Sequence, residues 1–210
     1  MNKNEVELVN RNKVTRIFPV LKHFNVPNVI TTMGMVFGII CCYFLARGDL
    51  RMAIVCLFMA GVMDLIDGYV ASKLNQQTAF GRHVDTLVDF FTCVIIPIWM
   101  VYDLLGDSLL IVLPMMFYCI CGLWRLANYN ITEAGKSFSG VPVPTAMLVV
   151  TVAIWCVVTY GFPLWFASIA FAIMGFMMIS NIPLPKYGPW HIILGLGGLG
   201  FMVHVILSGS

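Results

Sequence analysis

Two neighbouring segments place aspartates inside sequence that is otherwise apolar. The first is Asp64-Leu-Ile-Asp67-Gly68-Tyr-Val-Ala71, and the second is Gly81-Arg-His-Val-Asp85-Thr-Leu-Val-Asp89, after a short polar connection. A charged side chain in the middle of a membrane-spanning helix costs about 2.5 to 3.5 kcal/mol, so four without a partner would cost on the order of 10 kcal/mol. A binding partner must compensate for these charges, and we expect that partner to be part of the function.

The spacing of these residues is helical. Asp64 and Asp67 are three apart and share one helix face, while Gly81, Asp85 and Asp89 step by four and form one stripe. At a rise of about 1.5 Å per residue, Asp67 and Asp89 both lie roughly 10 Å from the basic residues that end their helices. If the two helices pack antiparallel, the four carboxylates converge on a cavity that opens to the cytoplasm.

Four carboxylates at one point repel one another unless cations lie between them. Mg²⁺ and Mn²⁺ prefer carboxylate oxygens, and a pair of such ions could hold a substrate diphosphate. Gly68 and Gly81 would leave room for a nucleotide between the helices. Two alternatives are ion pairs with Lys73, Arg82 or Arg125, and a cation-coupled transporter, which usually has internal symmetry and more spans. Of these three interpretations, the regular spacing of four acids together with two glycines favours a site for a metal-bound diphosphate.

The rest of the chain must position these helices within a membrane. Of its 210 residues, 60% are hydrophobic and 10% charged, against about 25% charged in soluble domains. We therefore expect an all-α polytopic membrane protein with a six-helix core and a seventh, glycine-rich C-terminal span. The predicted spans cover residues 28–46, 50–73, 80–102, 108–130, 144–160, 163–181 and 189–207.

The basic residues predict the orientation. With the N-terminus in the cytoplasm, all of the 12 Lys and Arg except Arg47 and Arg51 lie on the cytoplasmic side. Residues 1–26 are expected to form a cytoplasmic tail and an amphipathic surface helix, and residues 27–210 a single transmembrane domain. The net charge of +2 and the lack of long basic runs argue against nucleic acid as a partner.

The pattern Asp64-x-x-Asp67-Gly68-x-x-Ala71-x(9)-Gly81-x-x-x-Asp85-x-x-x-Asp89 resembles the signature of the CDP-alcohol phosphotransferases. The family pattern has Arg after the alanine, where this chain has Ser72 followed by Lys73. The resemblance implies an enzyme that binds a CDP-linked substrate and two divalent cations, transfers a substituted phosphoryl group to an alcohol, and releases CMP.

The resemblance also implies a role for each matching residue. Asp64, Asp67 and Asp85 would be the main metal ligands, and Asp89 a metal neighbour and the catalytic base. The residues expected to contact the nucleotide or diphosphate are Asn28, Thr31, Gly68, Ala71, Ser72, Lys73 and Gly81. Arg125 and Lys136 could hold an acceptor carboxylate or a lipid phosphate, or could simply be positive-inside anchors.

Three further segments are similar to the bacterial and archaeal phosphatidylserine synthase branch of that family. They are residues 124–130, 140–146 and 178–186, although Asn128 and Thr92-Cys93-Val94 depart from the branch pattern. This similarity implies CDP-diacylglycerol and L-serine as substrates, membrane lipids as surroundings, and a homodimer. The alternatives within the family are glycerol phosphate or inositol phosphate as acceptor, and CDP-choline or CDP-ethanolamine as donor to diacylglycerol.

Overall fold

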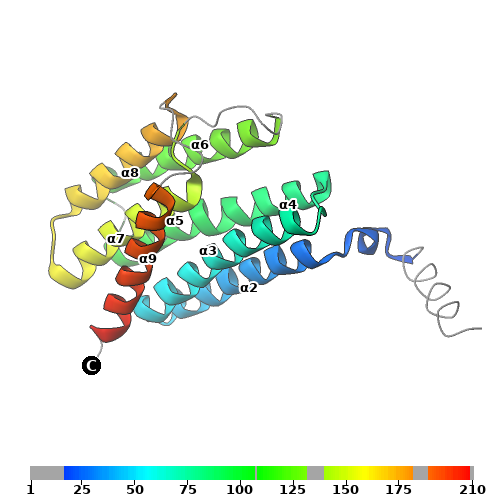
Figure 1. Cartoon of the computed structure of the whole chain (residues 1–210). Coiled ribbons are helices and arrows are strands. Elements are labelled where there is room, and N and C mark those ends of the chain that lie inside the picture. The colour runs from blue at the N-terminus through cyan, green and yellow to red at the C-terminus, as the bar shows by residue number, and fades with distance from the viewer. Residues whose placement is uncertain (1–16, 107, 132–139, 182–188, 209–210) are drawn as a thin grey trace, which may run out of the picture.

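The computed structural model describes residues 17–106, 108–131, 140–181 and 189–208, with backbone alone for residues 189–195. Every regular element in these ranges is a helix (Figure 1). In chain order they are η1 (Pro19–His23), α2 (Val26–Ala46), α3 (Leu50–Lys73), α4 (Ala79–Asp89), η2 (Phe90–Ile95), α5 (Ile96–Leu105), α6 (Leu109–Ile131), α7 (Val143–Tyr160), α8 (Leu164–Ile179) and α9 (Pro189–Leu207).

Five helical segments are long and apolar enough to cross a membrane. They are α2, α3, the continuous segment Ala79–Leu105 formed by α4, η2 and α5, then α6 and α7. This confirms the prediction of an all-α, multi-pass membrane protein. Helix α8 has 16 residues, and the side chains of α9 are described only from Leu196 to Leu207. Full crossings by these last two helices therefore stay predictions.

Local sequence signals explain where the first three spans begin. The side chain of Asn25 accepts a backbone N–H from the first turn of α2, and Pro27 lies in that turn, where its missing N–H costs no hydrogen bond. Asp49 caps α3 in the same way, and Thr78 caps α4. The predicted start of each span is consequently within two residues of the observed one.

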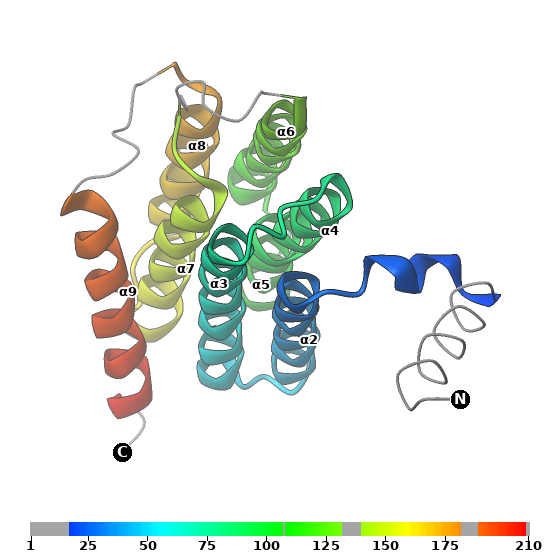
Figure 2. The ribbon, with the colours of Figure 1, turned by 45° about the vertical axis from the view of Figure 1, so that its right-hand side comes forward.

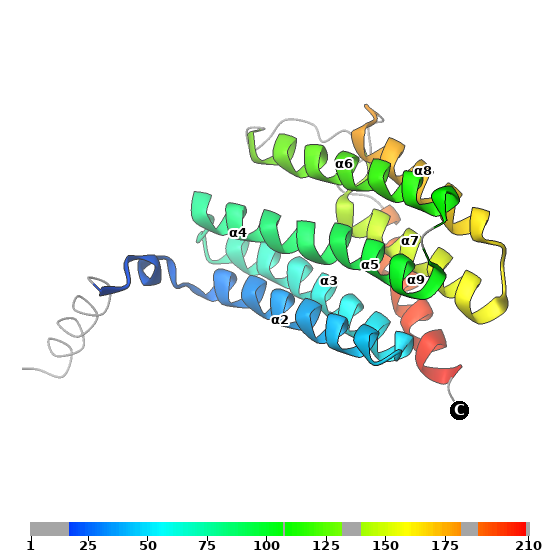
Figure 3. The same ribbon diagram turned by 180° about the vertical axis from the view of Figure 1, so that it is seen from behind.

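The helices form two groups that meet at the buried core. Helices α2, α3 and α4 run side by side, and α6 and α8 pair along their lengths (Figures 1 and 3). Figure 2 shows α9 at the edge of the bundle, where it contacts α3 and α7. Between the groups lies a core that includes Leu57, Val94, Tyr118, Ile154 and Phe171. This packing holds the two aspartate-bearing helices, α3 and α4, beside each other.

The third span was predicted over residues 80–102 and is observed as Ala79–Leu105. Its middle contains a π-helical segment, η2. Pro97 follows closely and has no N–H to donate to the carbonyl of Cys93, four residues earlier. The Tyr118 hydroxyl of α6 donates to that carbonyl instead, at 2.9 Å. A side chain of another helix thus satisfies this carbonyl, a contact that the apolar pattern of the span does not predict.

The predicted amphipathic surface helix is not confirmed. Residues 1–16 of the predicted segment lie outside the described residues. The remainder contains only η1, a 3-10 helix of five residues. Its neighbours Ile17, Phe18 and Phe24 are exposed apolar side chains, as is Val20 within it. Attachment of this segment to a membrane surface stays a prediction.

Candidate functional site

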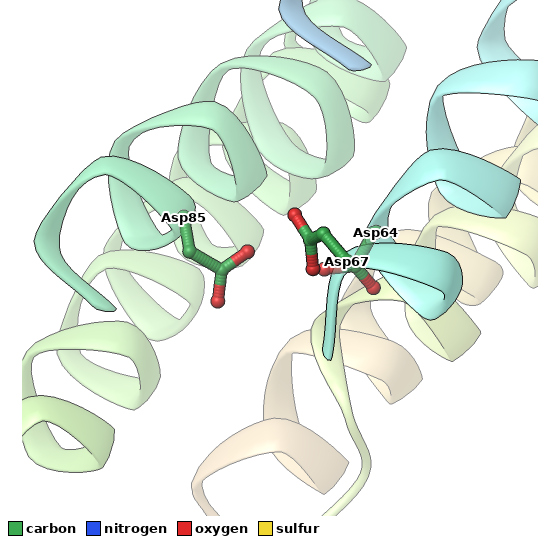
Figure 4. Close-up of side chains that lie close together, drawn as sticks. All are labelled: Asp64, Asp67 and Asp85. Carbon is green, nitrogen blue, oxygen red and sulfur yellow. The ribbon is translucent and has the colours of Figure 1, made fainter. Parts of the chain in front are cut away.

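Three aspartates from two helices meet at one point. Asp64 and Asp67 on α3 and Asp85 on α4 each offer a carboxylate oxygen, and these three oxygens lie within 4.8 Å of one another. Figure 4 shows the Asp85 carboxylate directed across the gap between the helices toward the other two. Asp67 is 5% exposed, and Asp64 and Asp85 are half-buried. The predicted convergence of these three residues is therefore observed.

The chemistry of this cluster fits a hard divalent cation. Its ligand atoms are all carboxylate oxygens, the type that Mg²⁺ and Mn²⁺ favour. A carboxylate oxygen of Asp64 and one of Asp85 lie within 4.8 Å of each other. Carboxylates this close repel when both are ionised, which a cation between them would relieve. Asp64, Asp67 and Asp85 are thus the residues that would hold a metal ion.

Asp89 lies beside this cluster rather than within it. It is one helical turn beyond Asp85 and interacts electrostatically with Asp64, Asp67 and Asp85. Its Oδ1 atom is 3.9 Å from the thiol sulfur of Cys93. The side chain is half-buried, at the junction of α4 and the π-helical segment. This position is compatible with the predicted division between three metal ligands and one neighbouring carboxylate.

Thr31 was predicted to contact the nucleotide, and the structure reveals a partner within the protein. Its hydroxyl is directed at the Oδ2 atom of Asp67 and at the carbonyl of Pro27. Thr31 is 5% exposed, so the contact with Asp67 is shielded from water. Helix α2 therefore supports the carboxylate cluster directly. Contact between Thr31 and a nucleotide stays a prediction.

The two glycines differ in their surroundings. A Cβ atom at Gly81 would lie 2.6 Å from Oδ1 of Asn28, whereas a Cβ atom at Gly68 would meet nothing within 4 Å. Asn28 is held there because its Nδ2 donates to the carbonyl of His23 at 2.8 Å. The Asn28 side chain thus occupies the space beside Gly81, and contact of either glycine with a nucleotide stays a prediction. Gly68 is exposed and faces open space.

The basic residues lie at the ends of their helices. Lys73 and its neighbour Ser72 are exposed in the last turn of α3, and the Lys73 ammonium lies 5.7 Å from the centre of the Tyr69 ring. Arg125 on α6 is half-buried, and its Nε donates to the carbonyl of Val141 at 3.5 Å. Ala71, in the same turn as Ser72, is half-buried. Lys136 lies outside the described residues.

The structure brings four further residues to the site that sequence reasoning did not single out. Asn130 on α6 donates from Nδ2 to the Thr86 hydroxyl on α4 at 2.9 Å, next to Asp85. Tyr129 interacts electrostatically with Asp64, Asp85 and Asp89. Cys93 contacts Asp89, as described above. The resemblance of residues 124–130 to a family segment was a signal for Tyr129 and Asn130, and Cys93 lies in a segment that departs from the branch pattern, but no signal pointed to Thr86.

Comparison with known proteins gives the family. The family model described as CDP-alcohol phosphatidyltransferase matches residues 24–182, about three quarters of the chain. This chain belongs to that family. The match begins just before α2 and ends just after α8, so it includes all four aspartates and excludes α9. The resemblance seen in the sequence is confirmed, and with it the expectation of an enzyme.

Three relatives of this chain have names that include serine. A CDP-diacylglycerol–serine O-phosphatidyltransferase of Methanocaldococcus jannaschii is 26% identical over 171 residues, which cover 81% of this chain and 79% of the relative. One of Bacillus subtilis is 27% identical over 169 residues, 77% of this chain and 90% of the relative. An archaetidylserine synthase of Methanothermobacter thermautotrophicus is 28% identical over 164 residues, which cover 76% of this chain and 69% of the relative. The names of all three relatives include serine, as the acceptor or as part of the lipid product.

Proposed function

We propose that this protein transfers the phosphatidyl group of CDP-diacylglycerol to the hydroxyl of L-serine and releases CMP. The observation that carries the proposal is the convergence of Asp64, Asp67 and Asp85 in a member of the CDP-alcohol phosphatidyltransferase family. The choice of serine as acceptor follows the names of the relatives. The reaction needs a cation-supported diphosphate and an activated alcohol, and the site has carboxylates for both tasks.

Asp64, Asp67 and Asp85 are the residues assigned to two divalent cations, Mg²⁺ or Mn²⁺, with Asp89 at their edge. When bound, such ions neutralise charge on the diphosphate as it reacts. Thr31 supports this assembly because its hydroxyl directs the Asp67 carboxylate. The half-buried position of the cluster restricts bulk water, which would otherwise compete with serine as the nucleophile.

Asp89 is assigned the role of general base. The serine hydroxyl oxygen attacks the phosphorus atom that carries diacylglycerol, and its proton passes to the Asp89 carboxylate. The bond between that phosphorus and the oxygen that bridges to the CMP phosphate breaks, and this oxygen leaves with CMP. A positioned base typically contributes about 10²- to 10⁴-fold to such a step. No covalent enzyme intermediate is needed.

The remaining residues are assigned to substrate binding. The donor nucleotide and diphosphate are assigned to Asn28, Thr31, Gly68, Ala71, Ser72, Lys73 and Gly81. The open space over Gly68 suits close approach of a ligand to the helix backbone. Lys73 supplies a positive charge one residue after Ser72, where the family pattern has Arg. Arg125 and Lys136 are assigned to the serine carboxylate or a lipid phosphate.

We further propose how the protein sits in the membrane. The excess of basic residues in one set of connections supports a cytoplasmic N-terminus and a site that opens to the cytoplasm. A six-helix core from α2 to α8 and a seventh crossing by α9 complete the transmembrane domain 27–210, preceded by the surface segment 1–26. The proposed assembly is a homodimer. This placement lets acyl chains stay in the bilayer while serine enters from the cytosol.

One assay tests the reaction. In one set of reactions, purified protein is mixed with Mn²⁺, CDP-diacylglycerol and either L-serine, glycerol phosphate or inositol phosphate. In a second set, it is mixed with Mn²⁺, diacylglycerol and either CDP-choline or CDP-ethanolamine. CMP release is measured in both. We expect CMP with serine and phosphatidylserine as the lipid product. CMP only with another pair would overturn the serine assignment, and no CMP with any pair would overturn the transferase.

A matched pair of variants excludes contaminating activity. Asp64→Asn removes a carboxylate from the cluster, whereas Asp103→Asn makes the same change at an exposed residue near the end of α5. We expect the first variant to lose activity and the second to keep it. Equal activity in both would mean that the measured CMP release does not come from this site.

A further inference from the structure

A buried thiol contacts the carboxylate that is assigned the role of base. The sulfur of Cys93 lies 3.9 Å from Oδ1 of Asp89, one helical turn earlier in the chain. Cys93 is 2% exposed, so water does not compete for this contact. An ionised carboxylate accepts hydrogen bonds only, which makes the S–H group the donor. The contact therefore restrains one of the two oxygens of Asp89.

The backbone that carries Cys93 is held by another helix. Pro97 leaves the Cys93 carbonyl without its usual donor, and the Tyr118 hydroxyl occupies that position at 2.9 Å. Tyr118 is itself fully buried, and its ring packs edge-on against Phe171 of α8. The donor to the carbonyl thus has little freedom to move. Cys93 is fixed relative to α6 and α8 as well as to its own helix.

Two glycines allow neighbouring helices to press on the same π-helical segment. A Cβ atom at Gly38 of α2 would lie 2.9 Å from Cγ2 of Thr92, and one at Gly122 of α6 would lie 2.7 Å from Cγ2 of Val94. Real Cβ atoms do not approach side chains so closely. Helices α2 and α6 therefore hold the residues on either side of Cys93. The sulfur of Cys93 lies between the Asp89 carboxylate and the Thr92 hydroxyl, whose oxygen is 3.6 Å away.

We propose that Cys93 is a positioning residue for Asp89. Its thiol holds Oδ1, which leaves the other oxygen of the same carboxylate to receive the proton of the acceptor hydroxyl. This inference rests on the proposed function, because it presumes that Asp89 is the base. Because Cys93 is buried, this role is exerted through Asp89 and not through contact with the substrate.

Two substitutions at Cys93 separate hydrogen bonding from packing. Cys93→Val removes the donor and is somewhat larger than cysteine, whereas Cys93→Ser keeps a donor but is smaller. If the thiol positions Asp89, we expect kcat to fall about tenfold in the valine variant and only about threefold in the serine variant, with KM for CDP-diacylglycerol unchanged in both. If Cys93 only fills space, the serine variant should lose more kcat than the valine variant. That result would overturn the proposal.

Cys121 provides the matched control. It is a free thiol on α6 with 3% exposure. At this position we expect the kcat of the Cys121→Ser variant to be no higher than that of the Cys121→Val variant. If the serine variant had the higher kcat at both positions, the fold would simply tolerate serine better than valine. That result would also overturn the specific role of Cys93.

A spectroscopic measurement tests the contact without any turnover. The infrared S–H stretching band of Cys93 is identified as the band lost in Cys93→Val. We expect it at the lower frequency of a hydrogen-bonded thiol, moving to that of a free thiol in Asp89→Ala. A band that is insensitive to Asp89→Ala would overturn the positioning role. Because this readout needs no substrate, it distinguishes failure of the inference from failure of the proposed reaction.

Discussion

The hydroxyl of Thr31 on α2 hydrogen-bonds to the carboxylate of Asp67 on α3, although 36 residues separate them in the chain. Both side chains are 5% exposed. This bond joins the first turns of α2 to the carboxylate cluster. It gives Thr31 an observable role that does not require a bound nucleotide.

Replacing Thr31 should therefore weaken metal binding. Thr31→Val keeps the shape of the side chain but removes the donor to Asp67. Loss of a partner that orients a metal ligand typically lowers metal affinity by about 10- to 100-fold. We expect that range for the apparent Mn²⁺ affinity, measured from the Mn²⁺ dependence of CMP release and by calorimetry.

Thr32→Val is the control for this prediction. Thr32 is exposed on the same helix, and its hydroxyl donates to the carbonyl of Asn28 at 2.7 Å. Its removal should leave Mn²⁺ affinity unchanged. Similar affinities for Thr31→Val and Thr32→Val would contradict the role given to the Thr31 hydroxyl.

The two glycines of the motif should respond differently to alanine. Gly81→Ala would bring a Cβ atom within 2.6 Å of Asn28 Oδ1, so either the Asn28 side chain must leave its hydrogen bond to His23 or α2 and α4 must separate. Overpacking of this kind typically costs about 1 to 3 kcal/mol, which a lower midpoint of thermal unfolding would report. Gly68→Ala meets no neighbour and should slightly raise the midpoint, because alanine favours helices by about 1 kcal/mol over glycine.

Activity gives the complementary readout for these glycines. If Gly68 lies under the nucleotide, Gly68→Ala should raise KM for CDP-diacylglycerol while the fold stays intact. An unchanged KM would remove Gly68 from the donor site. Equal unfolding midpoints for Gly81→Ala and the unmodified protein would mean that the contact with Asn28 is easily relieved.

Asp89→Asn should separate catalysis from binding. The amide keeps the size of the side chain but cannot take a proton from serine. We expect kcat to fall by about 10²- to 10⁴-fold, the usual contribution of a general base. Binding of CDP-diacylglycerol and Mn²⁺, measured by calorimetry, should change little. Turnover within a few-fold of the unmodified enzyme would exclude Asp89 as the base.

Removal of divalent cations should abolish the reaction reversibly. Treatment with a chelator should stop CMP release, and added Mn²⁺ or Mg²⁺ should restore it. Because an ion that binds only the folded state stabilises it, Mn²⁺ should also raise the unfolding midpoint. Asp67→Asn should reduce that rise, since it removes one of the clustered oxygens. Full activity after complete chelation would refute the metal requirement.

The sequence alone predicted the helices well because their signals are local. The predicted span 50–73 coincides with α3, Leu50–Lys73, whose start is capped by Asp49 and whose end is polar. Spacings of three and four residues put Asp64 beside Asp67, and Asp85 beside Asp89, since the period of a helix is known in advance. The same regular spacing with Gly68 and Gly81 carried the resemblance to the family.

The contacts between helices were decided only by the tertiary structure. The bond from Thr31 to Asp67, the Asn28 side chain over Gly81 and the Tyr118 hydroxyl on the Cys93 carbonyl each depend on how one helix is rotated and shifted against another. In an apolar chain many rotations bury similar surface, so hydrophobic periodicity does not select among them. Close packing at small residues and the need to satisfy buried polar groups make that selection.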